Sequence, residues 1–200
     1  TAVGPDGKNR RAKHSHPTRY YFMSLTLSSS TATAPKAVIV QIVQHLVPGG
    51  IETLTLELLR AAPPDTEVHI VSLEGNHDES LAKWPRLQSC SAQLQKKKKP
   101  PGFQPALFLR LARLLWQLKA TAVHTHHMGP LLYGGLAARM CGISRWVHTE
   151  HDAWYLNAPK AKKLVSQCLR WFHPTLIADA NNVAIAVQNA IPSARPGVIY

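Results

Sequence analysis

Residues 37–43 form a near-continuous run of β-branched and other apolar side chains, Ala-Val-Ile-Val-Gln-Ile-Val. Such a run is typical of a strand that is buried on both faces of a parallel sheet. A Pro-Gly-Gly turn follows at residues 48–50, and apolar residues then recur at helical spacing between residues 51 and 62. The segment therefore predicts a buried strand, a glycine turn and a helix, in that order.

The same alternation continues along the chain. Further strands are predicted at residues 67–73, 89–94, 121–125, 145–149, 175–178 and from residue 197. Helices are predicted at residues 107–118, 130–141, 164–172 and up to residue 190, the last capped by Asn181 or Asn182. Strands that alternate with helices imply an α/β fold with a doubly wound, mostly parallel, Rossmann-like sheet.

Two parts of the chain differ in composition. Residues 1–35 are basic and rich in Ser and Thr, have no apolar periodicity, and are predicted to form a disordered tail. Residues 36–200 are predicted to form one Rossmann-like domain. Its last strand is the end of the sequence, so we expect a domain truncated before a further, C-terminal one.

The formal net charge of +12 is concentrated in residues 8–19 and in the lysine run at residues 96–99. Such patches attract anions without fixing which, and an anionic membrane surface is one expected partner. Nucleic acid is not expected, because no aromatic residues or nucleic-acid motif accompany the basic runs.

The cysteines and the apolar runs limit the class of protein further. Three cysteines without C-x-x-C spacing do not form a disulfide framework, and they favour a reducing, cytoplasmic location. Every apolar run is shorter than the roughly eighteen residues that a membrane-spanning helix needs. We therefore expect a soluble or peripheral protein.

Candidate site residues follow three of the predicted strands, at the sheet edge where ligands bind in open parallel sheets. Gly49 and Gly50 follow the first strand. Glycines let a ligand approach the backbone, and the start of the next helix offers N–H groups to an anion. A strand-to-helix turn also needs glycine for steric reasons, so this signal alone is weak.

Histidines follow two other strands, in the clusters His124–His127 and His148–His151. Imidazoles titrate near neutral pH, and two clusters at one edge indicate a shared site. One hypothesis is a metal centre, although the H-E-x-x-H spacing is absent. The other is that a histidine or carboxylate orients hydroxyl groups of an organic substrate or accepts a proton.

Three motifs occur in order: residues 42–52 (Ile-Val-Gln-His-Leu-Val-Pro-Gly-Gly-Ile-Glu), 123–126 (Val-His-Thr-His) and 147–152 (Val-His-Thr-Glu-His-Asp). Together they resemble the N-terminal, acceptor-side domain of glycosyltransferase family 4, and the resemblance covers about residues 36–200. It implies the GT-B fold and a retaining sugar transfer from a nucleotide-sugar donor, with no metal and no cofactor. The acceptor would be a glycan or a lipid-linked glycan at the inner face of the membrane.

The resemblance also implies roles for residues. It assigns the catalytic position to His151, donor binding to Gly49 and Gly50, and supporting positions at the cleft to His126, His148 and Glu150. The chain departs from the family at Thr121-Ala122, where relatives often have an Asp, and at Asn181-Asn182, in place of Ser-Glu. The half of a GT-B enzyme that grips the donor is not represented, so we expect the chain alone to transfer little sugar.

Two other hypotheses remain from the residues themselves. One is a metal-dependent hydrolase that uses the clusters His124–His127 and His148–His151. The other is a non-catalytic binding domain.

Overall fold

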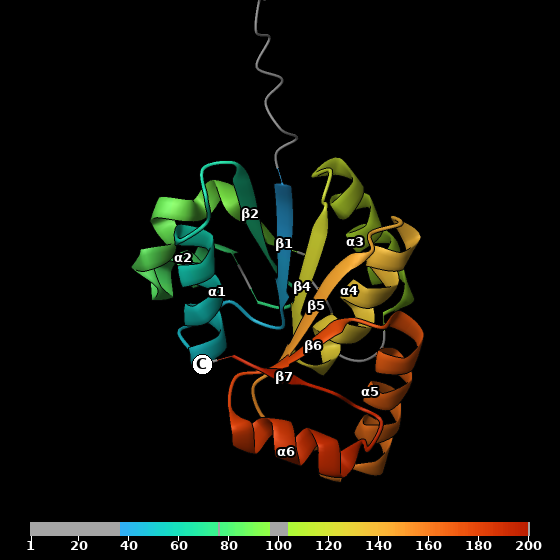
Figure 1. Cartoon of the computed structure of the whole chain (residues 1–200). Coiled ribbons are helices and arrows are strands. Elements are labelled where there is room, and N and C mark those ends of the chain that lie inside the picture. The colour runs from blue at the N-terminus through green and yellow to red at the C-terminus, as the bar shows by residue number, and fades with distance from the viewer. Residues whose placement is uncertain (1–36, 76, 97–103, 200) are drawn as a thin grey trace, which may run out of the picture. The chain divides into compact units, whose positions relative to one another are not determined.

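A seven-stranded, all-parallel sheet forms the centre of the structure, a computed structural model that describes residues 37–75, 77–96 and 104–199. The strands lie in the order β3-β2-β1-β4-β5-β6-β7 (Figure 1). Their bounds are β1 (Ala37–Val43), β2 (Thr66–Ser72), β3 (Leu94–Lys96), β4 (Ala122–His126), β5 (Arg145–Glu150), β6 (Thr175–Ala178) and β7 (Gly197–Val198). The strand order reverses between β1 and β4. A ligand crevice is therefore expected at the carboxyl ends of these two strands.

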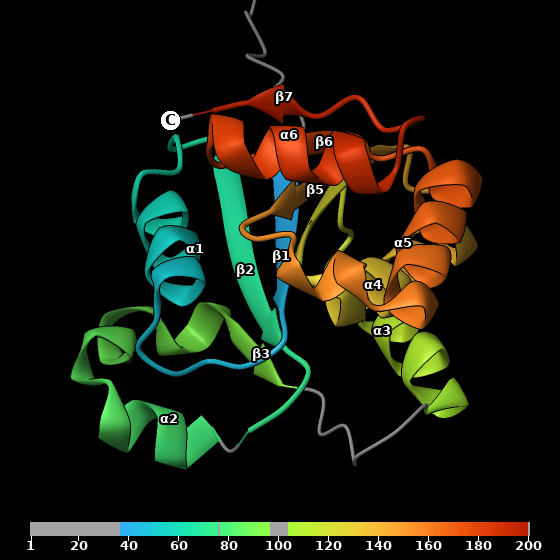
Figure 2. The same ribbon diagram turned by 90° about the horizontal axis from the view of Figure 1, so that it is seen from below.

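Helices follow the strands, as the alternation predicted. They are α1 (Gly50–Arg60), α2 (His77–Lys83), α3 (Pro105–Gln117), α4 (Met128–Met140), α5 (Pro159–Phe172) and α6 (Asn181–Ala190), with short 3₁₀ helices η1 (Pro85–Gln93) and η2 (Trp154–Asn157). In Figures 1 and 2, α1 and α2 lie on one side of the sheet, and α3, α4 and α5 lie on the other. The doubly wound prediction is confirmed, and the described sheet is wholly rather than mostly parallel.

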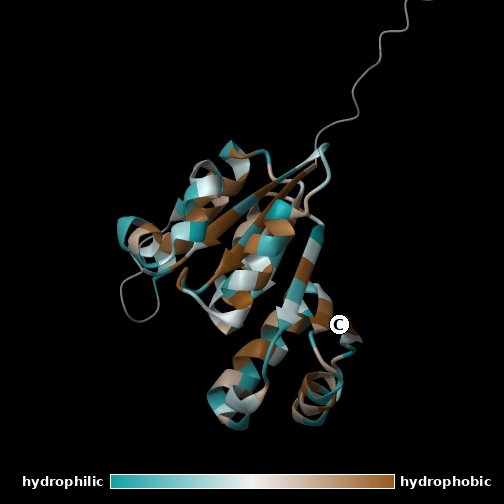
Figure 3. Ribbon diagram, turned by 90° about the vertical axis from the view of Figure 1, so that its left-hand side faces the viewer, coloured by the Kyte–Doolittle hydropathy of each residue, from teal (hydrophilic) through white to brown (hydrophobic). Residues whose placement is uncertain are grey.

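The hydrophobic core has one cluster for each side of the sheet. The larger cluster joins the strands to α3, α4 and α5, and the smaller one joins Val43 and Ile70 to Leu56 of α1 and to η1. Figure 3 shows the hydrophobic character of the central strands. Helix α4 packs close to the sheet, because a Cβ added at Gly134 would lie 2.8 Å from both Ile42 Cδ1 and Thr125 Cγ2.

Two local predictions were wrong. Residues 89–93 belong to η1 rather than to a strand, and β3 begins only at Leu94. Trp84, Leu87 and Cys90 are all buried, and their spacing of three residues fits the 3₁₀ repeat rather than a strand. Neither asparagine caps α6: its N-cap is Ala180, which makes no side-chain bond, and Asn181 is the first helical residue.

Several predictions concern residues outside the described part of the chain. The tail at residues 1–35 and the lysines at 97–99 lie there, so their predicted behaviour stays a prediction. Within the described part, Cys90, Cys141 and Cys168 are free thiols. No helix in those same ranges is both long and apolar enough to cross a bilayer.

Candidate functional site

The two histidine clusters lie side by side because β4 and β5 are neighbours in the sheet. His124 pairs with Val147, Thr125 with His148, and His126 with Thr149 along this ladder. Side chains alternate between the two faces of a strand, so each cluster is divided between the faces. Histidines that are neighbours in the sequence can therefore lie on opposite faces of the sheet, and the site is described below by face.

The two faces differ in exposure. We call the first the open face, because its strand residues Ile39, Ala122, Val147 and Ile177 are only partly buried. His124, His126 and Thr149 belong to this face. The opposite, covered face lies beneath α3, α4 and α5 and carries His148 and Glu150, which are 0% and 2% exposed.

On the open face, three side chains form a continuous hydrogen-bonded chain. Asp179, which directly follows β6, has its Oδ2 atom 2.9 Å from Nδ1 of His151. The other ring nitrogen of His151, Nε2, lies 3.0 Å from Nδ1 of His126. This series of hydrogen bonds therefore connects the carboxylate of Asp179, which is 38% exposed, to His126, which is fully buried.

With both rings neutral, the bonding pattern assigns each proton to one nitrogen. A carboxylate only accepts hydrogen bonds, so Nδ1 of His151 carries the proton that it donates to Asp179. Nε2 of a neutral His151 is then an acceptor, and His126 donates to it through Nδ1. The remaining nitrogen of His126, Nε2, is buried without a partner, which agrees with an unprotonated ring nitrogen at that position.

Burial keeps the deeper histidines neutral. It lowers the pKa of His126 well below its ordinary value, and the neighbouring His124 and His151 lower it further. Burial, with His148 and His151, lowers the pKa of His124 to about 4. His124 also contacts Thr149, with Nε2 at 2.8 Å from Oγ1. His124 and His126 are therefore neutral at neutral pH.

On the covered face, His148 and Glu150 belong to a second network. Trp146 donates its indole N–H to Thr125 Oγ1 at 3.1 Å, and Thr125 lies 2.9 Å from Nδ1 of His148. His148 reaches Glu150 Oε1 through Nε2 at 3.1 Å, and Tyr155 donates its hydroxyl to the same oxygen at 2.6 Å. Neither His148 nor Glu150 lines any of the pockets described below.

Glu150 is the ionised carboxylate of this network. Burial by itself raises the pKa of Glu150, but the hydrogen bonds from His148 and Tyr155 outweigh it, so the net pKa is lowered. Burial and the adjacent Glu150 carboxylate raise the pKa of Tyr155, which therefore remains a hydrogen-bond donor. The ionised Glu150 holds Tyr155, and with it η2, against the end of β5.

Two pockets open at the carboxyl edge of the sheet. One, of about 480 Å³, lies beside the loop after β1 and the start of α4 and is lined by Gln44, Glu52 and His127, among others. The other, of about 860 Å³, lies between η2, α5 and α6 and includes His151 and Asp152 in its lining. His127 and His151, the last histidines of the two sequence clusters, therefore face separate pockets.

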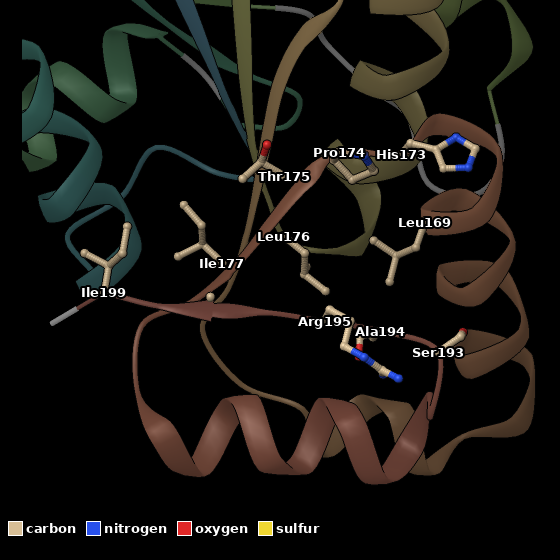
Figure 4. Close-up of a pocket in the computed structure, with 11 residues that line it drawn as sticks. Leu169, His173, Pro174, Thr175, Leu176, Ile177, Ser193, Ala194, Arg195 and Ile199 are labelled. Carbon is tan, nitrogen blue, oxygen red and sulfur yellow. The ribbon is translucent and has the colours of Figure 1, made fainter.

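A further pocket, of about 550 Å³, lies around the start of β6 and the segment that leads into β7 (Figure 4). Leu176, Ile177 and Ile199 give it a largely apolar lining. It contains none of the residues predicted for the site.

Gly49 and Gly50 are exposed at the start of α1, where Gly49 is the N-cap in an extended conformation. A Cβ at Gly49 would overlap the Glu52 carboxylate, whereas a Cβ at Gly50 would meet nothing within 4 Å. Close approach of a ligand is therefore open at Gly50, and at Gly49 it requires the Glu52 side chain to move. Neither glycine lines the described pockets.

Metal binding has no support from the geometry of the described ranges, where no group of three or more His, Cys, Asp or Glu side chains is placed to hold an ion. The ring nitrogens of His151 bond to Asp179 and His126 instead of converging on a common point.

A family model described as Glycosyltransferase Family 4 matches residues 48–200, three quarters of the sequence. The chain belongs to glycosyltransferase family 4. The match begins at Pro48, after β1, and includes all three clusters of predicted site residues. No curated protein sequence gives a significant match.

Solved glycosyltransferase structures share the fold of this family 4 domain at low sequence identity. Alr3699/HepE from Anabaena, solved in complex with UDP-glucose, is 17% identical with a TM-score of 0.62, over 82% of this chain and 43% of that one. The glycosyltransferase from Rickettsia africae is 19% identical with a TM-score of 0.59, over 83% of this chain and 42% of that one. MurG from Acinetobacter baumannii is 14% identical with a TM-score of 0.53, over 82% of this chain and 44% of that one. The chain thus spans less than half the length of each of these proteins.

The structure adds residues that the sequence did not single out for this family 4 domain. Asp179 follows a predicted strand, so the strand-end rule that selected the histidines could also have found it. Thr149 and Tyr155 gave no such signal, because their contacts depend on the pairing of β4 with β5 and on the fold of η2.

Proposed function

We propose that this chain forms the acceptor-side domain of a retaining glycosyltransferase that takes its sugar from a nucleotide-sugar donor. Its acceptor is a glycan or a lipid-linked glycan. Membership of family 4 supports the class of reaction, and the UDP-glucose held by the similarly folded HepE supports the class of donor. The observation that carries the proposal is the bonded chain of Asp179, His151 and His126, at the sheet edge where such folds bind ligands.

In this proposal His151 contacts the donor sugar. Its Nδ1–H is committed to Asp179, which leaves Nε2 as the nitrogen that can exchange its bond with His126 for one with a sugar hydroxyl. A donor hydroxyl then donates to Nε2, while Asp179 keeps its bond to Nδ1 and the stacked ring of His126, with its centroid 5.3 Å away, supports the imidazole from behind. Gly50, next to the free start of α1, lies against the donor, and Gly49 joins it once Glu52 swings away.

The supporting residues act from the covered face. His148 and Glu150 hold Tyr155, and Tyr155 belongs to the lining of the 480 Å³ pocket. In the reaction, the bond between the anomeric carbon and the diphosphate breaks, a bond to an acceptor hydroxyl oxygen forms, and the proton of that hydroxyl passes to the departing diphosphate oxygen. The nucleoside diphosphate departs with the bonding electrons.

The site of action is the cytoplasm, at the inner face of a membrane. One stripe of α5 supports this part of the proposal, because Lys160, Lys163, Arg170 and Trp171 are all exposed along it. Basic residues beside an exposed aromatic ring are suited to an anionic lipid surface.

The test uses the full-length gene product, UDP-glucose and a panel of other nucleotide sugars, and measures release of nucleoside diphosphate. We expect release from at least one donor, and His151→Ala should lower the rate by about a hundredfold or more. His173→Asn is the matched control, because His173 is exposed in a left-handed position that Asn tolerates. Zinc-dependent hydrolysis, or a rate unchanged in His151→Ala, would overturn the proposal.

A further inference from the structure

Trp154 lies on the border between the two pockets at the carboxyl edge. It belongs to the lining of both the 480 Å³ and the 860 Å³ pocket, and 72% of the residue is exposed. Exposure alone does not distinguish this indole, since single hydrophobic residues are common on protein surfaces. Its place between two pockets does distinguish it, because a ligand in either pocket would contact the ring.

The ring is held in place from below. Trp154 meets Tyr155 edge to face, with ring centroids 6.3 Å apart and an interplanar angle of 90°. Tyr155 is fixed by its 2.6 Å bond to the buried Glu150, and Leu156, in the same turn, is 2% exposed. The exposed indole is thus mounted on a rigid turn, which lowers the entropy cost of stacking a ligand against it.

The two pockets offer similar chemistry on either side of Trp154. Gln44, Glu52 and His127 contribute polar groups to the smaller pocket. Asn182 and Asn189 contribute amides to the larger one. Amides, carboxylates and imidazoles can both surround and orient hydroxyl groups, since together they supply donors and acceptors.

Sugar rings have the matching properties: an apolar C–H face that packs on an aromatic ring, and a rim of hydroxyl groups. The larger pocket, of about 860 Å³, meets the donor sugar at His151 and has room beside it for an acceptor unit at its Trp154 end. We propose that Trp154 is a stacking platform for an acceptor glycan of at least two sugar residues, which crosses the indole and places units in both pockets. This inference rests on the proposed function and narrows its acceptor to an oligosaccharide.

Other exposed tryptophans provide controls. Trp116 on α3 is 76% exposed and Trp171 on α5 is 56% exposed, and neither lines a described pocket. If exposure alone caused glycan binding, all three residues would contribute. The proposal assigns the effect to Trp154 alone.

The experiment is an array of bacterial-type oligosaccharides of one to six residues, probed with the purified 200-residue chain. We expect binding to glycans of two or more residues and weaker binding to monosaccharides. Trp154→Ala should weaken the binding by about tenfold, Trp154→Phe should keep most of it, and Trp116→Ala should leave it unchanged. Thermal unfolding of each variant verifies folding, which the exposed side chain of Trp154 should not affect.

Three results would overturn the inference: no glycan bound by the unsubstituted chain, monosaccharides bound as tightly as longer chains, or Trp154→Ala binding like the unsubstituted chain. Failure of the proposed function gives a different result, because release of nucleoside diphosphate without a glycan, with water taking the sugar, reports on the donor site alone. Glycan binding through Trp154 in a protein that releases no diphosphate would keep the inference for a binding domain and reject the transferase. Diphosphate release without Trp154-dependent glycan binding would keep the transferase and reject the inference about Trp154.

Discussion

Asp179 and His151 form a carboxylate–imidazole pair, with Oδ2 and Nδ1 2.9 Å apart, although 28 residues separate them in the sequence. The pair orients His151 from the end of the neighbouring strand, since β5 and β6 are adjacent. Such a carboxylate fixes the tautomer of a histidine and the direction of its second nitrogen. Asp179 is therefore a positioning residue for the proposed site.

Without the Asp179 carboxylate, His151 should no longer be held in a single neutral tautomer. In Asp179→Ala, we expect His151 to populate both neutral tautomers, whereas the unsubstituted chain should show the proton on Nδ1 alone. Long-range ¹H–¹⁵N NMR spectra of the imidazole distinguish the two. Asp65→Ala is the control, because Asp65 is exposed and directly precedes β2, at the amino edge of the sheet, whereas His151 follows the carboxyl end of β5. An unchanged tautomer in Asp179→Ala would contradict the role given to this residue.

Replacing Glu150 should destabilise the fold. Glu150→Leu removes the acceptor of two buried donors, on His148 and Tyr155, and should cost about 2–4 kcal/mol in the free energy of unfolding. Glu150→Gln keeps an acceptor oxygen and should cost less. Urea denaturation measures both. Glu57→Gln is the control, since Glu57 is half exposed in its ion pairs and should change stability by less than about 1 kcal/mol.

Stability should fall in mild acid. The pKa of His124 in the folded chain is lowered to about 4, whereas the unfolded chain keeps a value of about 6.5. Between these values the unfolded chain binds more protons, so the free energy of unfolding decreases as pH falls through this window, and the His124 contribution levels off below pH 4. His126 acts in the same direction.

Urea denaturation between pH 7.5 and pH 4.5 measures this dependence. His124→Gln should reduce the slope of stability against pH within the window, because it removes one of the titrating groups. A slope of equal size in His124→Gln and the unsubstituted chain would show that other groups cause the loss of stability.

A methyl group at Gly134 should disturb the contact between α4 and the sheet. In Gly134→Ala the new Cβ would lie 2.8 Å from side-chain atoms of Ile42 and Thr125, and we expect a loss of about 1–3 kcal/mol. Gly50→Ala is the control, because its Cβ would meet nothing within 4 Å. Equal stability of the two variants would contradict the close packing of α4.

Much of the fold could be predicted because strong patterns agree with the final environment. The run at Ala37–Val43 is rich in β-branched residues and is buried on both faces from residue 40 to residue 43, and the structure gives that strand the predicted bounds. The prediction of the third strand was wrong for the opposite reason. Its sequence is short and polar, and the buried residues before it repeat every three positions, a period that strand and α-helix patterns do not include.

The candidate site could be predicted only in part. The strand-end rule placed His126 and His151 at one edge, and the structure joins them directly. The rule could not separate His148 from them. Alternation shows that His148 and Glu150 share a face of β5, but which residues of β4 lie opposite depends on the register of the two strands. That register is set by packing over the whole sheet.

The anomeric configuration of the product tests the central claim most directly. The full-length protein is supplied with a nucleotide sugar from which it releases diphosphate and with an oligosaccharide that it binds, and the product is followed by ¹H NMR. We predict a new glycosidic bond with the anomeric configuration of the donor, and no such bond with His151→Ala. Inverted configuration, or free sugar as the only product of a zinc-dependent reaction, would contradict the account.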